Sequence, residues 1–177
     1  MHKVSFWLLT CWLLLPGKLA ACTEDATAIR YLEAIETMQW QRMRSLLAVD
    51  ALYTDPTMVH FDRDAISIQG AENIVAFWRS SSEDSGTNQI NYEITACFET
   101  AGYYIVNLDI NTLVSGRLWN VNKREIVLSG RVMSVIHVAD GRVIEHHDYV
   151  EYSNADRLVA ELQRKYGRTG PDTDEAN

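Results

Sequence analysis

The chain has 177 residues, of which 47% are hydrophobic and 10% aromatic, and this composition is typical of a single globular domain with a proper core. Its formal net charge is -8, and none of its 16 lysine and arginine residues forms a cluster of the kind that binds phosphate groups. A disordered chain and a nucleic-acid-binding protein are therefore both disfavoured.

The first 21 residues are typical of an export signal rather than of a folded segment. Lys3 supplies a positive start, an apolar run follows from Phe6 to Leu15, and Pro16 breaks that run. The run is too short to cross a bilayer as a mature helix. We therefore predict a signal peptide over residues 1–21.

The residues LAAC at positions 19–22 resemble the bacterial lipobox, in which small residues precede a cysteine that is lipidated and becomes the new N-terminus. The resemblance implies a lipid on Cys22, a lipidated linker over residues 22–26 and an extracytoplasmic place in the cell envelope, where the lipid alone contacts the membrane. Thr23 favours the outer membrane over the inner. Ordinary cleaved secretion and an uncleaved anchor are the alternatives.

The three cysteines then have different fates. Cys11 leaves with the signal peptide, Cys22 carries the lipid, and Cys97 alone remains in the folded domain. On this interpretation no intrachain disulfide framework is expected.

Hydrophobic residues at helical spacing predict two consecutive helices, the first over residues 28–38 and the second over residues 40–47. Asp55 precedes Pro56, and because a residue before proline is pushed out of the helical region, this pair marks a turn or the end of a strand. Gly70 opens a third helix, whose apolar face comprises Ile74, Phe77 and Trp78.

After residue 90 the hydrophobic period changes to two, which predicts strands over residues 90–98, 103–114, 126–138 and 143–152. Asp140 and Gly141 indicate a hairpin turn between the last two strands. Ser153 can cap a final helix that Gly167 stops, and the polar residues 167–177 are predicted to form a disordered tail. This order of elements predicts an α+β domain over residues 27–166, with helices packed on one face of a curved antiparallel sheet.

That order, together with the strings YTDPT, IQGAENIVAFW and VADGRVIEHHDYVEY, resembles the nuclear-transport-factor-2-like superfamily. Its members include SnoaL-like polyketide cyclases, ketosteroid isomerases and limonene-epoxide hydrolases. The resemblance covers residues 27–166 and implies a cone-shaped domain whose pocket takes an apolar small molecule without a cofactor. It also implies the homodimer that members of the superfamily frequently form through the open face of the sheet.

Two patterns of site residues follow from this resemblance. In ketosteroid isomerases a tyrosine on the first helix and an aspartate before a proline act together, and Tyr31 and Asp55 occupy the matching places. The third acid of that pattern falls near Met133, whose thioether cannot donate a hydrogen bond, so isomerase chemistry is weakened.

In limonene-epoxide hydrolases the matching positions hold Tyr53, Asp55, Asn107, Asp109 and Asp148. Asn107 stands where that family has an arginine, which removes the charge that holds two nearby carboxylates at different protonation states. Three aspartates gathered in an apolar cavity could not all ionise cheaply, so at least one is expected to have a raised pKa and to act as an acid beside an ionised base.

Structural interpretations of the same residues remain open. On their strand, Asn107 and Asp109 share the more polar face, so alternation alone places them in solvent. Asp55 can simply cap the turn before Pro56, and Tyr31 can be an ordinary helix-face aromatic residue.

His146 and His147 are adjacent on one strand and point to opposite faces, so the sequence shows no zinc-ligand spacing and no metal is expected.

The sequence therefore supports two hypotheses. In the first, the pocket performs cofactor-free hydration, isomerisation or cyclisation, with Asp55, Asp109 and Asp148 as acid and base groups. Tyr53 and Tyr31 then donate hydrogen bonds, and Asn107 orients the substrate. In the second, the protein binds a hydrophobic ligand or a partner protein without chemistry.

Overall fold

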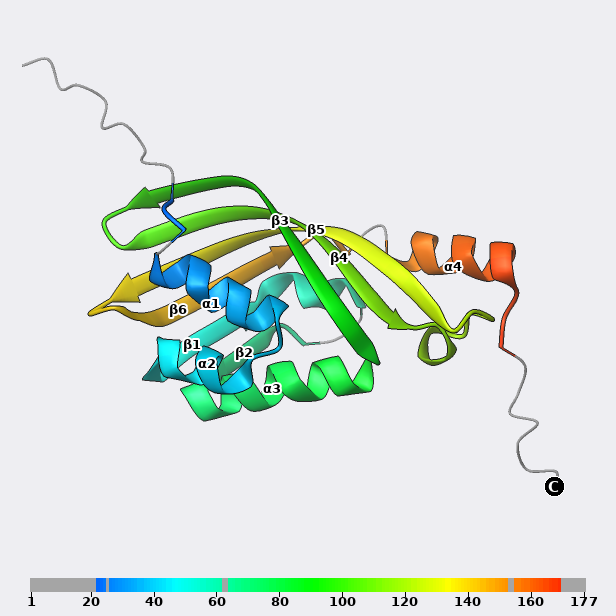
Figure 1. The fold of residues 1–177 in the computed structure, drawn as a ribbon, viewed down its shortest axis with the longest axis horizontal. Coiled ribbons are helices and arrows are strands. Elements are labelled where there is room, and N and C mark those ends of the chain that lie inside the picture. Colours follow the sequence, from blue (N-terminus) through cyan, green and yellow to red (C-terminus); the bar gives the residue numbers. More distant parts are fainter. Residues whose placement is uncertain (1–21, 25, 62–63, 153–154, 170–177) are drawn as a thin grey trace, which may run out of the picture.

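The computed structural model describes residues 22–24, 26–61, 64–152 and 155–169 (Figure 1). The predicted signal peptide, Ser153 and residues 170–177 of the predicted tail lie outside this part of the chain. No helix within the described ranges is long and apolar enough to cross a membrane.

One curved sheet of six strands forms the centre of the molecule, in the order β2-β1-β6-β5-β4-β3. The strands are β1 (Leu47–Asp55), β2 (Ile66–Gln69), β3 (Thr87–Thr100), β4 (Tyr103–Ser115), β5 (Glu125–Ala139) and β6 (Arg142–Val150). The α+β class and the curved sheet are as predicted. The sheet is mixed rather than wholly antiparallel, because β1 pairs with β6 in parallel.

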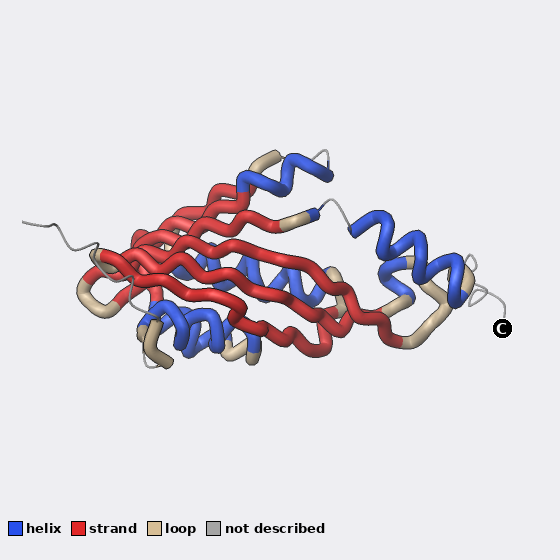
Figure 2. Tube along the Cα trace, turned by 90° about the horizontal axis from the view of Figure 1, so that it is seen from above, coloured by secondary structure: helices blue, strands red, loops and turns tan. Residues whose placement is uncertain are grey.

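Three helices cover one face of the sheet: α1 (Thr27–Glu36), α2 (Trp40–Leu46) and α3 (Ala71–Asp84) (Figure 2). Their apolar sides meet the inner face of the strands in the main core. Helix and strand residues that are no more than 1% exposed include Tyr31, Ile35, Met43, Leu47, Ile74, Val106, Ile136 and Val143. The helical spacing read from the sequence therefore identified the buried sides of α1 and α3.

Strands β3 to β5 extend beyond the three helices and carry a second, smaller core. Val114, Val121 and Ile126 form it, and Leu162 of α4 (Ala155–Tyr166) packs against them. Gly167, with a φ of 82°, ends α4 as expected. Two residues of the predicted tail contact the loop between β4 and β5: Gly167 accepts a hydrogen bond from the Asn122 amide at 2.9 Å, and the Thr169 hydroxyl donates one of 2.7 Å to Asn120 Oδ1.

Strand pairing places the other face of the sheet away from the helices. Phe98 pairs with Ile105, and Met133 pairs with both Asn107 and Tyr149, so these residues share one face. That face exposes large hydrophobic residues, namely Phe98, Tyr103, Ile105, Val127, Met133 and Tyr149. A homodimer through this face stays a prediction.

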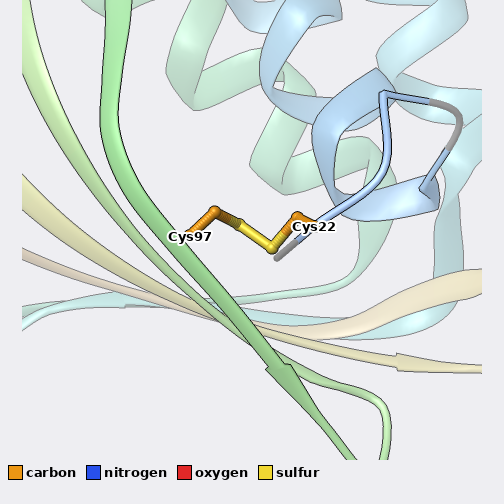
Figure 3. Close-up of a disulfide and its surroundings, with 2 residues drawn as sticks. All are labelled: Cys22 and Cys97. Atoms are coloured by element: carbon orange, nitrogen blue, oxygen red, sulfur yellow. A yellow bond between two sulfur atoms is a disulfide. The ribbon is translucent and has the colours of Figure 1, made fainter. Parts of the chain in front are cut away.

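A disulfide joins the segment ahead of α1 to the sheet. Cys22 is bonded to Cys97 of β3, 75 residues further along the chain (Figure 3). The expectation that no intrachain disulfide forms is therefore wrong: the fold brings the two Cα atoms to 5.5 Å, well within the span of a disulfide. A sulfur bonded in this way cannot also carry a thioether-linked lipid.

Candidate functional site

A pocket of about 220 Å³ lies between the helices and the inner face of the sheet. Its walls are mostly apolar, and no lysine or arginine of the described part of the chain lines it. The lining residues are Leu32, Tyr53, Trp78, Ser81, Ser82, Ser85, Thr87, Ile90, Tyr92, Leu108, Ile110, Thr112, Val132, Ser134, His146, Asp148, Val150 and Tyr152.

Asp148 is the charged centre of this pocket, and three side chains donate hydrogen bonds to its carboxylate. Ser134 Oγ lies 2.5 Å and His146 Nε2 2.8 Å from Oδ1. The Tyr53 hydroxyl lies 3.2 Å from Oδ2. Asp148 is only 5% exposed, so these bonds replace the water that a carboxylate would otherwise require.

Strand register explains why these four residues meet. His146 and Asp148 are two residues apart on β6 and therefore point to the same face of the sheet. Ser134 of β5 stands opposite Asp148, and Tyr53 of β1 stands opposite His146. The site thus depends on both neighbours of β6, one antiparallel and one parallel.

The pKa of Asp148 lies below its ordinary value. Burial alone would raise this pKa, but the positive charge of His146 and the hydrogen bonds from His146, Ser134 and Tyr53 outweigh burial. Asp148 is therefore an ionised group at neutral pH. For this aspartate, the expectation of a raised pKa in an apolar cavity is wrong, because the cavity wall supplies a full set of donors.

Tyr31 extends the network away from the pocket. Its hydroxyl lies 3.2 Å from His146 Nδ1, so His146 bridges Tyr31 and Asp148. Burial is the main reason why the pKa values of both Tyr31 and Tyr53 lie well above 10, and the nearby charge of Asp148 adds to it. Both phenols therefore remain protonated at neutral pH. Tyr53 lines the pocket, whereas Tyr31 is not among the lining residues and contacts His146, so a role for Tyr31 as a donor to the substrate stays a prediction.

Asp55 belongs to a neighbouring hydrogen-bond group rather than to the pocket wall. Its Oδ1 accepts hydrogen bonds from the Thr57 amide at 2.9 Å and the Thr57 hydroxyl at 2.5 Å, across Pro56. Its Oδ2 accepts one from the Tyr152 hydroxyl at 2.6 Å, and Tyr152 does line the pocket. Asp55 is thus the turn cap that the sequence allowed, and the Tyr152 hydroxyl connects it to the cavity.

Asn107 and Asp109 are not part of the pocket, which corrects their assignment to the site. Leu108 and Ile110 line the cavity, and alternation along β4 turns Asn107 and Asp109 to the opposite face. Asp109 pairs across the strands with Arg131, which is exposed on that outer face. The strand pattern was therefore a better guide than the family resemblance at these two positions.

Sequence reasoning missed two donors that line the pocket. The pKa of Tyr92 is raised above 10 by burial and by the charges of Asp148 and Glu36, so its phenol stays protonated. Within the described part of the chain, Trp78 Nε1 is buried without a hydrogen-bond partner. A buried N–H group without a partner is costly, so a ligand acceptor placed against it would be stabilised.

The described residues hold no group of three or more histidine, cysteine, aspartate or glutamate side chains able to bind a metal ion. His146 and His147 point to opposite faces of β6, as alternation requires. His147 Nδ1 lies 2.7 Å from the Thr54 hydroxyl, whereas His146 faces the pocket. The two histidines therefore have separate surroundings.

Residues 28–146 match the SnoaL-like domain, and the chain belongs to that family. The fold and the pocket on the inner face of its sheet agree with this assignment. No curated protein matches the chain in sequence.

Solved structures share the fold at low sequence identity. A candidate SnoaL-like polyketide cyclase from Shewanella putrefaciens is 14% identical, with a TM-score of 0.66 over 76% of this chain and 94% of its own. A protein with a ketosteroid isomerase-like fold from Catenulispora acidiphila, solved with trimethylamine, is 12% identical, with a TM-score of 0.63 over 78% of this chain and 95% of its own. An LEH-like epoxide hydrolase from M. tuberculosis is 14% identical, with a TM-score of 0.59 over 78% and 90%.

Proposed function

We propose that this protein is a cofactor-free enzyme that removes a proton from a largely apolar small molecule, in an isomerisation, cyclisation or hydration. The observation that carries the proposal is the ionised Asp148 carboxylate in the wall of an otherwise apolar pocket. A carboxylate in such a place is suited to general base catalysis, which typically contributes on the order of 10²- to 10⁴-fold in rate.

The two carboxylate oxygens of Asp148 have different roles in this proposal. Oδ1 accepts both short hydrogen bonds, from Ser134 and His146, whereas among the described residues Oδ2 accepts only the longer one from Tyr53. Oδ2 is therefore the oxygen with capacity left for a substrate proton. His146 also lines the pocket, but its Nε2 is bonded to Asp148 and its Nδ1 to Tyr31, so we assign it as a positioning residue.

Charge that develops on a substrate oxygen requires hydrogen-bond donors in the same pocket. The Tyr92 phenol, which remains protonated, and the unpartnered Trp78 Nε1 are suited to this role. Donors fixed in a site that excludes water stabilise a developing oxyanion without reorganising during the reaction. The reaction class that fits these groups is enolisation next to a carbonyl.

Replacing Asp148 by asparagine is expected to reduce proton abstraction about 10²- to 10⁴-fold, because asparagine keeps the volume of the side chain but cannot accept the proton as a base. We would follow exchange of the α-protons of 2-tetralone into D₂O by proton NMR. Asp109→Asn is the matched control and should stay within about twofold of the wild type, since Asp109 lies on the outer face. Equal exchange rates in wild type and D148N would contradict the proposal.

Ligand binding without chemistry is the second candidate, and the lowered pKa of Asp148 favours it. A carboxylate with three donors is a weak base but still a buried negative charge. Around it the pocket places the aromatic side chains of Tyr53, Trp78, Tyr92 and Tyr152, and cations bind to such faces. The trimethylamine complex of the Catenulispora protein, which is similar in fold, supports an amine as the ligand.

Tetramethylammonium and the neutral tert-butanol have similar sizes and would distinguish the two candidates in calorimetric titrations. A binding pocket for amines is expected to prefer the cation by tenfold or more, and D148N should remove that preference because it removes the charge. Equal, weak binding of both compounds by the wild type would count against the amine ligand. The proposed enzyme would then be tested by the proton-exchange experiment with D148N.

A further inference from the structure

The segment that was expected to be a free, lipidated linker is instead held against the domain. Cys22 is half-buried and packs against the main core, next to the disulfide partner Cys97. The Ala26 amide donates a hydrogen bond of 3.1 Å to the carbonyl of Thr23, and α1 begins at the next residue, Thr27. No length of free chain therefore separates Cys22 from the folded domain.

This placement is unfavourable for a lipid-bearing cysteine. Acyl chains on Cys22 would have to leave a half-buried site beside β3, and the bilayer would have to lie directly against α1 and the edge of the sheet. The sulfur of Cys22 can form only one further bond, either to the lipid glycerol or to the sulfur of Cys97. The fold favours the second bond because it brings the two cysteines together.

We propose that the mature protein carries the Cys22–Cys97 disulfide in place of a lipid on Cys22, and that the domain is released into an oxidising compartment outside the cytoplasm. In this step the two thiols lose two protons and two electrons and form the sulfur–sulfur bond. A disulfide-containing oxidant of that compartment accepts the electrons and protons and becomes a dithiol, through thiol–disulfide exchange.

The two fates of Cys22 give different intact masses, so the full chain should be expressed in a bacterium and its mature form analysed without reductant. We expect a polypeptide mass without added lipid, in the fraction released from the periplasm, and no reaction with iodoacetamide until a reductant is added. A mass increased by diacylglycerol, recovery with the membranes and alkylation of Cys97 without reduction would overturn the proposal.

Substitutions of the two cysteines supply a second, independent readout. If the disulfide is present, Cys22→Ser and Cys97→Ser should each lower the melting temperature by roughly 5–15 °C. The melting temperature of the double variant should then be no lower than that of either single variant. If Cys22 carries lipid, Cys22→Ser alone changes the protein and Cys97→Ser behaves as the wild type. The intact mass of the wild type distinguishes the disulfide from the lipid even where a cysteine variant fails to accumulate.

Discussion

Replacing His146 by leucine is expected to lower the free energy of unfolding by roughly 3–5 kcal/mol, because it leaves the Asp148 carboxylate buried without its charged partner. His146 is 2% exposed and Asp148 5%, so neither group can turn to water when the other is removed. The Tyr31 hydroxyl loses its hydrogen bond to His146 Nδ1 in the same variant.

Urea unfolding of a double-mutant cycle would isolate the energy of this pair. Asp148→Leu alone should also be destabilising, because the buried donors of Ser134, Tyr53 and His146 then lose their acceptor. The loss in free energy of unfolding of the double variant should be smaller than the sum of the two single losses, because no unpaired charge remains. Additive losses would show that the two side chains do not interact.

His147→Gln is the matched control for the loss of an imidazole from β6. His147 is the next residue, points to the opposite side and retains contact with solvent beside Glu145. Its substitution should change the free energy of unfolding by less than about 1 kcal/mol, as for other half-exposed polar residues. A loss as large as that of the His146 variant would mean that the effect comes from the strand and not from the pocket.

Alkaline pH is expected to unfold the protein steeply, because Tyr31 and Tyr53 are buried as neutral phenols. Their pKa values in the folded state are raised well above 10, whereas in the unfolded chain they ionise near 10. Below pH 10 both states keep the protons and stability is unaffected. As the pH rises further, the unfolded state alone loses them, so the free energy of unfolding falls by about 2.7 kcal/mol per pH unit for the two tyrosines.

Tyrosinate absorbance at 295 nm and far-ultraviolet circular dichroism, recorded together after a pH jump, would test this expectation. The ionisation of the buried tyrosines should coincide with the loss of secondary structure. Tyr149→Phe should leave the alkaline midpoint unchanged, since Tyr149 lies on the exposed outer face. Complete ionisation of all tyrosines near pH 10 in a still folded protein would contradict the expectation.

Local periodicity made most of the helices and strands predictable. The β5–β6 hairpin follows directly from Asp140 and Gly141, which both adopt the positive φ that such a turn requires. Strand β2 was missed because its four residues are too few to show an alternating pattern. The parallel pairing of β1 with β6 was missed because it joins segments far apart in the chain, and no local signal specifies such a partner.

The candidate site was predictable to the extent that one strand determines it. Asp148 and His146 share a face of β6, and this much follows from alternation alone. Alternation does not predict the surroundings of Asp148, because its donors also come from β1 and β5. The pKa of a buried carboxylate depends on how many donors reach it. The family resemblance assigned Asn107 and Asp109 to the pocket, whereas the alternation of apolar residues along β4 predicted that they face outward.

The disulfide could not have been predicted from the spacing of the cysteines. Cys22 and Cys97 are 75 residues apart, and they are close because the fold places the segment ahead of α1 beside β3. The signal-like context of Cys22 suggested another use for its sulfur. Pairing of cysteines is a tertiary property, so it becomes visible only once the fold is known.

The parallel contact between β1 and β6 also has a consequence for the order of assembly. Strands β3 to β6 form a continuous meander whose neighbours in the chain are neighbours in the sheet, so they can associate with short loops. Tyr53 meets His146 only after a connection of more than 90 residues is closed, which is the entropically costly and slow step. A chain in which this contact has not yet formed would place Ser134 opposite Asp148 but would lack the Tyr53 hydroxyl, so the set of donors to Asp148 is complete only once β1 has joined the sheet.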